Sequence, residues 1–183
     1  PEIGPIDMII VTGDLTDFGK KEEYSLFREI VEELGVPYRV IPGNHDDKLR
    51  MHNAFADMDW MPIKGPINWE LDFYDLKIIA LDTSITGMAH GNLESISLDF
   101  LRASLSTANG KPVLVATHHP PIITGLEKMD IQNLRDSAEL KEVLSAHTGE
   151  LKLICGHVHR NIVGQFGNKL CQIAPGVSHA VTT

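Results

Sequence analysis

The stretch Ile9-Ile10-Val11-Thr12-Gly13-Asp14-Leu15-Thr16-Asp17 contains the strand and the turn on which the predicted fold depends. Its short run of β-branched residues is followed by residues that favour a turn, which is typical of a fully buried strand. Asp14 then lies at the carboxyl end of that strand, where open α/β sheets bind their ligands. A Gly-Asp pair is also common at strand ends for the turn alone, so a ligand role for Asp14 depends on the other strand ends.

Length and composition indicate one domain with no large basic surface. The chain has 183 residues, of which 43% are hydrophobic and 22% charged, as in ordinary globular domains. Its net charge of −9 argues against binding of a nucleic-acid polymer, although metal ions can supply the positive charge for a small anionic substrate. We expect no membrane segment and no signal peptide. Only Cys155 and Cys171 occur, without Cys-x-x-Cys spacing, which indicates a reduced, cytoplasmic protein.

The apolar periodicity predicts alternating strands and helices within a single domain spanning residues 1–183. A helix is expected over residues 20–34 and a strand over residues 38–41, so that the first strand, the helix and this strand form a parallel βαβ unit. The remaining pattern predicts an antiparallel hairpin over 70–81, helices over 97–108 and 135–147, strands over 112–117 and 151–155, and a closing pair of strands over 169–174 and 177–181.

Residues 49–70 interrupt this pattern. They contain Trp60, Trp69 and three methionines, and Pro62 and Pro66 break any regular element. Two interpretations follow. The segment is either a helix and loop packed on the core, or a cap over the substrate side that uses adaptable apolar surface.

Four predicted strand ends carry side chains that can bind metal: Asp14, Asn44-His45, His118-His119 and His157-Val158-His159. Each has a simpler explanation on its own. Asn44 suits a tight turn, His119 can cap the following Pro-Pro bend, and histidines two residues apart can share an exposed strand face. Independent turns nevertheless give no reason for carboxylate, amide and imidazole groups to collect at one sheet edge. Together these donors suit Mn, Fe, Co or Zn better than Mg, Ca or a structural cysteine-bound zinc.

The motifs at these positions resemble those of the calcineurin-like metallophosphoesterases. Gly13-Asp14-x-x-Asp17, Gly43-Asn44-His45-Asp46, His118-His119-Pro120 and Gly156-His157-x-His159 occur in the family's order. The sequence around these motifs is most similar to that of bacterial class III cyclic-nucleotide phosphodiesterases and related glycerophosphodiesterases. The resemblance implies a four-layer α/β-β/α sandwich in which two mixed sheets are flanked by helices.

The resemblance also implies an activity. Two ions, each Mn, Fe, Zn or Co, would lie at the carboxyl ends of the strands, and a hydroxide that bridges them would attack a small phosphodiester. That substrate is either a cyclic nucleotide or a glycerophosphodiester. A phosphomonoesterase of the same fold and a non-catalytic interaction protein are the alternatives. The oligomeric state is left open, and a homo-oligomer is compatible with the sequence.

The resemblance assigns the five metal ligands by position. Asp14 matches the carboxylate that bridges the two ions and so takes part in catalysis. Asn44, His118 and His157 match the remaining protein ligands of one ion, and His159 matches a ligand of the other.

Four further residues are expected near the ligands. His45 matches the catalytic histidine that contacts the phosphate or assists the leaving oxygen without binding metal. Asp17 and Asp46 are expected either to contact the ligand residues, with Asp46 orienting His45, or to serve in turns. His179, in the last loop, either reaches the pocket or remains on the surface.

One family motif does not occur in this chain. The family begins with Asp-x-His on the strand before Asp14, and these residues bind the ion that His159 also serves. No Asp-x-His occurs here, and Pro1 to Pro5 read as a loop inside a domain, so we expect the N-terminal strand to be missing. We therefore expect the ion on the His159 side to be weakly bound or absent.

Overall fold

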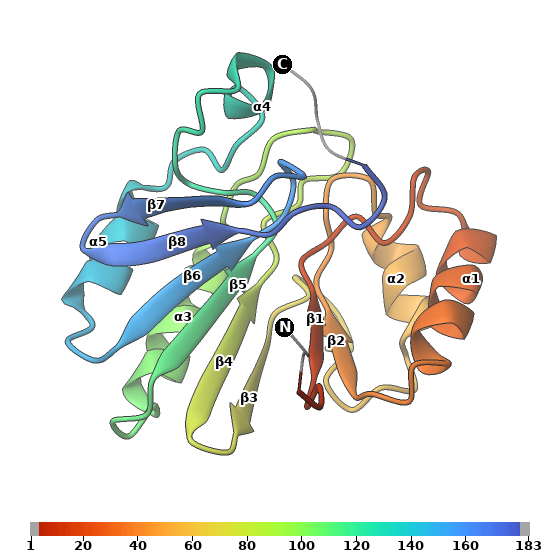
Figure 1. Cartoon of the computed structure of the whole chain (residues 1–183), viewed down its shortest axis with the longest axis horizontal. Coiled ribbons are helices and arrows are strands. Elements are labelled where there is room, and N and C mark those ends of the chain that lie inside the picture. Colours follow the sequence, from red (N-terminus) through yellow and green to blue (C-terminus); the bar gives the residue numbers. More distant parts are fainter. Residues whose placement is uncertain (1–3, 180–183) are drawn as a thin grey trace.

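The first two strands form a small parallel sheet in the computed structural model, which describes residues 4–179 (Figure 1). Strand β1 (Ile9–Val11) pairs with β2 (Tyr38–Val40), and helix α1 (Lys21–Glu32) connects them. The helix begins after Lys20, whose backbone N–H donates to the Glu23 carboxylate at 2.7 Å and so satisfies a free donor of the first turn. The predicted βαβ unit is confirmed.

The second sheet is larger and mixed. Its strands run in the order β3 (Trp69–Phe73), β4 (Leu76–Leu81), β5 (Val113–Thr117), β6 (Leu151–Cys155), β8 (Lys169–Ile173) and β7 (Ile162–Phe166). The four central strands are parallel, and β3 and β7 pair antiparallel at the two edges. The expectation of two mixed sheets therefore holds only for this sheet, because β1 and β2 are parallel.

Alternation along the strands divides the core into two parts. Ile79 and Leu81 of β4 pack in one cluster with residues of α3 (Ser95–Ser106) and α5 (Ala138–Ala146). The intervening Ile78 and Ala80 belong to a second cluster, shared with β2, α1 and α2 (Lys48–Ala54). The order of layers is thus α1 and α2, the small sheet, the large sheet, then α3 and α5 (Figure 1). This is the predicted four-layer sandwich.

The interrupted segment over residues 49–70 contributes to the second core cluster. Phe55, Trp60 and Trp69 are all buried there. The Trp69 indole N–H donates to the carbonyl oxygen of Val40 at 2.8 Å, which links the large sheet to the small one. These contacts favour the interpretation of a helix and loop packed on the core. A cap formed by the exposed part of the segment stays a prediction.

The C-terminal strands differ from the prediction. The closing hairpin is β7 with β8, and residues 177–179 are not in a strand, while residues 180–181 lie outside the described part. Strand β7 was missed because it is short, half-exposed and interrupted by Gly164. The four-residue helix α4 (Glu127–Asp130) was also not predicted. Within residues 4–179, none of the helices combines the length and the apolar character needed to cross a membrane.

Candidate metal centre

Four of the five predicted ligands meet where the two sheets adjoin. His118 Nε2 lies 3.1 Å from Asn44 Oδ1 and 3.3 Å from Asp14 Oδ2. His157 Nδ1 lies 2.9 Å from Asn44 Oδ1 and 3.2 Å from His118 Nε2. Asp14 and Asn44 follow strands of the small sheet, and the two histidines follow strands of the large sheet. The centre is therefore assembled from both sheets.

The atoms that meet there are mostly hydrogen-bond acceptors. The His118 Nδ1–H donates to the carbonyl oxygen of Thr12 at 2.6 Å, so Nε2 of the neutral ring presents its lone pair to Asp14 and Asn44. His157 meets these groups through Nδ1, while its other ring nitrogen, Nε2, is buried without a hydrogen-bond partner among the described residues. Carboxylate, amide oxygen and imidazole lone pairs at these separations repel one another unless a proton or a metal cation lies between them. The donor set fits a divalent transition-metal ion.

A proton on His118 fills part of the cation's role when no metal is bound. Burial opposes the charged form of both Asp14 and His118, but their mutual hydrogen bond and opposite charges outweigh it. As a result, the pKa of Asp14 is held well below its usual range and the pKa of His118 is raised. Metal binding at this position is thus coupled to release of a proton.

His119, which is one of the strand-end residues that can bind metal but has no assigned role in the family resemblance, also lies in the cluster. Ring nitrogens of His118, His119 and His157 lie within 4.8 Å of one another, the one such group of His, Cys, Asp or Glu in residues 4–179. Thr83 Oγ1 accepts the His119 backbone N–H at 3.3 Å and lies 2.8 Å from Nδ1. When the hydroxyl donates to Nδ1 of the neutral ring, the ring hydrogen is on Nε2. In this tautomer His119 is a donor rather than a ligand.

Burial keeps two of the clustered imidazoles neutral. Desolvation, followed by the charge of His118, lowers the pKa of His119 to about 2 and that of His157 to about 3. A neutral imidazole is the form that binds a metal or donates a single hydrogen bond.

The ligand loops depend on unusual backbone conformations. Asp14, His157 and His159 have φ values of +55°, +69° and +56°, a region that is strained for residues other than glycine. Gly43 packs against Asp14 so closely that an added Cβ would overlap the carboxylate and backbone nitrogen of Asp14. The backbone is thus strained at residues that carry predicted ligands, and it packs closely against the Asp14 side chain.

Asp46 joins the two loops of the small sheet. Its Oδ2 accepts the backbone N–H groups of Gly43 at 2.9 Å and Leu15 at 3.2 Å. Its Oδ1 accepts the hydroxyl groups of Thr16 and Tyr24. Burial raises the pKa of this carboxyl group. Asp46 therefore fixes the loops that carry Asp14 and Asn44, without contacting a ligand side chain.

The His45 ring is oriented by Asp17 rather than by Asp46, contrary to the expectation. Its Nδ1–H donates to the Asp17 carbonyl oxygen at 3.0 Å, and the Asp17 carboxylate lies 3.8 Å away. The His45 backbone N–H donates to Asp14 Oδ1 at 3.0 Å. Because the His45 side chain is 46% exposed, its Nε2 remains accessible beside the ligands.

His159, the fifth predicted ligand, lies outside the tight cluster. Its ring packs against that of His179, with ring centroids 4.6 Å apart. Its Nδ1 is buried without a hydrogen-bond partner in the described part of the chain, and burial lowers its pKa. His179 contacts the His159 ring but is itself exposed, and its role stays a prediction. The ligand role of His159 stays a prediction.

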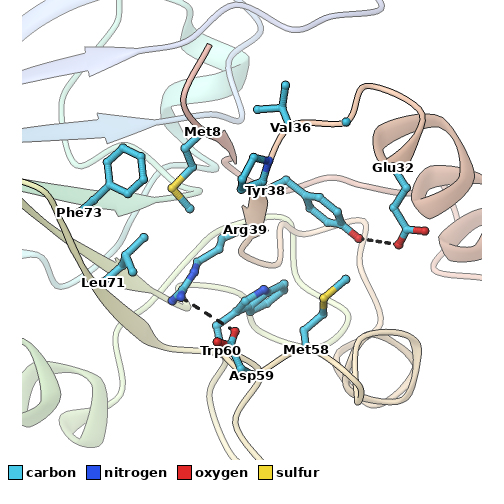
Figure 2. Close-up of a pocket in the computed structure, with 12 residues that line it drawn as sticks. Met8, Glu32, Val36, Tyr38, Arg39, Met58, Asp59, Trp60, Leu71 and Phe73 are labelled. Carbon is cyan, nitrogen blue, oxygen red and sulfur yellow. Dashed lines mark hydrogen bonds and ion pairs between the residues drawn. The ribbon is translucent and has the colours of Figure 1, made fainter. Parts of the chain in front are cut away.

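A separate pocket opens at the opposite, amino ends of β1 and β2 (Figure 2). It encloses about 580 Å³ and is lined by Met8, Tyr38 and Trp60, among others. Arg39 crosses it toward Asp59, at 4.0 Å. None of the clustered histidines lines this pocket, so it is distinct from the candidate metal centre.

The chain belongs to the calcineurin-like phosphoesterase family, whose Metallophos model matches residues 1–161. A probable glycerophosphodiester phosphodiesterase, GpdQ, of Arcobacter nitrofigilis is 39% identical over 176 residues, which are 96% of this chain and 64% of that protein. A 3',5'-cyclic adenosine monophosphate phosphodiesterase, CpdA, of Pseudomonas aeruginosa is 32% identical over 182 residues, covering 94% of this chain and 64% of that protein. The chain thus spans less than two thirds of either relative.

A solved structure supports the same fold. A dimetal phosphatase from Danio rerio superimposes with a TM-score of 0.73 at 14% identity, over 94% of this chain and 73% of that one. At this level of identity the likeness establishes the architecture alone.

Replacing Gly43 tests the close packing around Asp14. Gly43→Ala should weaken Mn²⁺ affinity by at least about tenfold, because the new Cβ displaces the Asp14 carboxylate. Gly164→Ala is the matched control, since its Cβ meets only the flexible tip of Ile122. Isothermal titration calorimetry measures both affinities. Equal Mn²⁺ affinities for the two variants would contradict the assignment.

The buried neutral His119 predicts a pH-dependent stability. Its pKa is about 2 in the folded protein and 6.5 in the unfolded chain, so between these values only the unfolded state binds the proton. The free energy of unfolding therefore rises with pH over this window. In His119→Gln the rise should be smaller by about 1.4 kcal/mol per pH unit. Urea unfolding in EDTA from pH 4.5 to 6 measures it, and identical slopes for the two proteins would disprove it.

Proposed function

We propose that this chain is the catalytic part of a metal-dependent hydrolase acting on a small phosphodiester. The observation that carries the proposal is the convergence of Asp14, Asn44, His118 and His157, whose carboxylate, amide and imidazole groups together fit a divalent cation. Family membership supports a phosphoesterase. The relatives named as glycerophosphodiester and cyclic-AMP phosphodiesterases support a diester substrate.

The four converging residues would hold one ion. Asp14 would also bind a second ion, together with His159. The metals in question are Mn, Fe, Zn or Co, and the chemistry they supply when bound is Lewis-acid activation of the phosphoryl group and of water. We expect the Asn44 side to bind more tightly, because its donor atoms already meet, whereas His159 lies outside that cluster.

His45 is the group we assign to the substrate. Its Nδ1–H is engaged by the Asp17 carbonyl, which fixes the ring and leaves Nε2 accessible. Neutral His45 can accept a hydrogen bond at Nε2, and protonated His45 can bind a phosphate oxygen or donate its proton to the leaving oxygen. Asp17 thus acts by orienting the ring.

The candidate substrates differ in whether the phosphate carries a second ester substituent and in what that substituent is. A cyclic nucleotide and a glycerophosphodiester are equally compatible with the site, and a phosphomonoester is the runner-up. A non-catalytic interaction protein is disfavoured because Asp14, Asn44, His118, His157 and His159 are all retained. The free, buried thiols of Cys155 and Cys171 support a cytoplasmic enzyme.

Removing one ligand tests the activity. Asn44→Ala should reduce kcat/KM for bis-(p-nitrophenyl) phosphate by at least about a hundredfold with Mn²⁺ supplied, because the cation loses a ligand. Asn53→Ala, an exposed asparagine of α2, is the matched control and should keep full activity. The full-length gene product should also be assayed on a cyclic nucleotide, a glycerophosphodiester and a monoester. A protein that binds Mn²⁺ and hydrolyses none of them would contradict the proposal.

A further inference from the structure

The ligands of the candidate centre come from two sheets, and the chain that joins these sheets at that edge is the long connection over residues 41–68. Asn44 belongs to the loop after β2 in the small sheet, whereas His118 belongs to the loop after β5 in the large sheet. Ligand atoms must be held within fractions of an ångström for a metal site to be selective. Some contact must therefore fix the distance between these two loops.

Asp82 is a buried carboxylate at the required place. It follows β4 directly, and β4 pairs with β5 so that Leu81 lies opposite Thr117, one residue before His118. Its side chain is 0% exposed. Oδ1 accepts the backbone N–H and the hydroxyl group of Ser84 at 2.9 and 2.7 Å, and Oδ2 accepts the Ile67 N–H at 3.1 Å.

Lys48 reaches this carboxylate from helix α2, which follows the loop after β2. It is the first residue of α2, four residues after Asn44 and three after His45. Its Nζ lies 3.0 Å from Asp82 Oδ2, and its side chain is 23% exposed. The ion pair thus connects the loop that carries Asn44 and His45 to the end of β4.

The end of β4 is connected in turn to the histidine loop. Thr83, the residue after Asp82, accepts the backbone N–H of His119 and contacts its ring nitrogen at 2.8 Å. The His119 ring lies against those of His118 and His157, with centroids 4.7 and 4.8 Å away. A continuous set of contacts therefore runs from Lys48 to the clustered histidines.

We propose that the Lys48–Asp82 ion pair is a positioning device that sets the spacing between Asn44 and His118, and so the affinity of the metal site. The inference rests on the proposed metal site but not on the proposed reaction. Neither residue is among the predicted ligands, and their side chains contact each other rather than a ligand.

The energetics of buried charge support a role in geometry. Removing two charges from water is expensive, and a well-packed apolar pair of the same volume often gives equal or greater stability. A buried ion pair is therefore weak evidence for a gain in stability. Its directional contacts fix a distance and an orientation, which an apolar pair does not do as strictly.

The chain contains a matched control. Lys77, at the amino end of β4, is also buried, with its side chain 1% exposed. Its Nζ lies 3.2 Å from Glu70 Oε2 and donates to Thr107 Oγ1 at 3.0 Å. Because β4 separates Lys77 from the metal edge, its loss should affect folding without affecting the ligands.

The test compares Mn²⁺ affinity by isothermal titration calorimetry with stability by urea unfolding. Lys48→Met should weaken Mn²⁺ affinity about tenfold, and Lys48→Arg should recover most of it because the positive charge is kept. Lys77→Met should lower stability and leave Mn²⁺ affinity unchanged. If Lys48→Met does not fold, Asp82→Asn, which keeps acceptor and donor groups, should show the same loss of affinity.

Three results would overturn the inference: unchanged affinity in both Lys48→Met and Asp82→Asn, an equal loss in Lys77→Met, or a wild-type protein that does not bind Mn²⁺. The last result would also overturn the proposed function. Wild-type protein that binds Mn²⁺ but hydrolyses no phosphoester would overturn the proposed function alone, and the affinity comparison would still decide the role of the ion pair.

Discussion

The mutual repulsion of acceptor atoms at one edge of the sandwich is the constraint on which the site depends. The carboxylate of Asp14, the amide oxygen of Asn44 and ring nitrogens of His118 and His157 each lie within 3.3 Å of at least one other member of the set. Without a proton or a cation between them, the acceptor atoms repel one another at that separation. A proton on His118 relieves part of the repulsion, and a divalent cation relieves more of it because it offers several coordination positions.

The rest of the structure holds these groups together against that repulsion. Asp46 fixes the two loops of the small sheet through backbone N–H groups, and Lys48 with Asp82 joins those loops to the large sheet. Left-handed backbone at Asp14 and His157 shows that the loops are strained as well as crowded. Such strain persists only where packing overdetermines the conformation, and here the two core clusters on either face of the large sheet provide that packing.

The local patterns were sufficient to predict most of the fold. Strand β6 and the βαβ unit follow from apolar runs and a helical repeat, and the strand-end residues Asp14 and Asn44 follow from motifs in sequence order. The hydrogen-bonded role of His119 and the contact of Lys48 with Asp82 were not predictable. They depend on the register of β4 with β5 and on the approach of two sheets, which single-sequence periodicity does not contain. Strand β7 was missed because its burial alternates weakly around a glycine.

The most direct test of the account is anomalous diffraction at the zinc edge from crystals grown with Zn²⁺. The account predicts a peak with Asp14, Asn44, His118 and His157 donor atoms at about 2.0–2.2 Å. A peak bounded by His118, His119 and His157 without Asp14, or no peak at this edge of the sandwich, would contradict it.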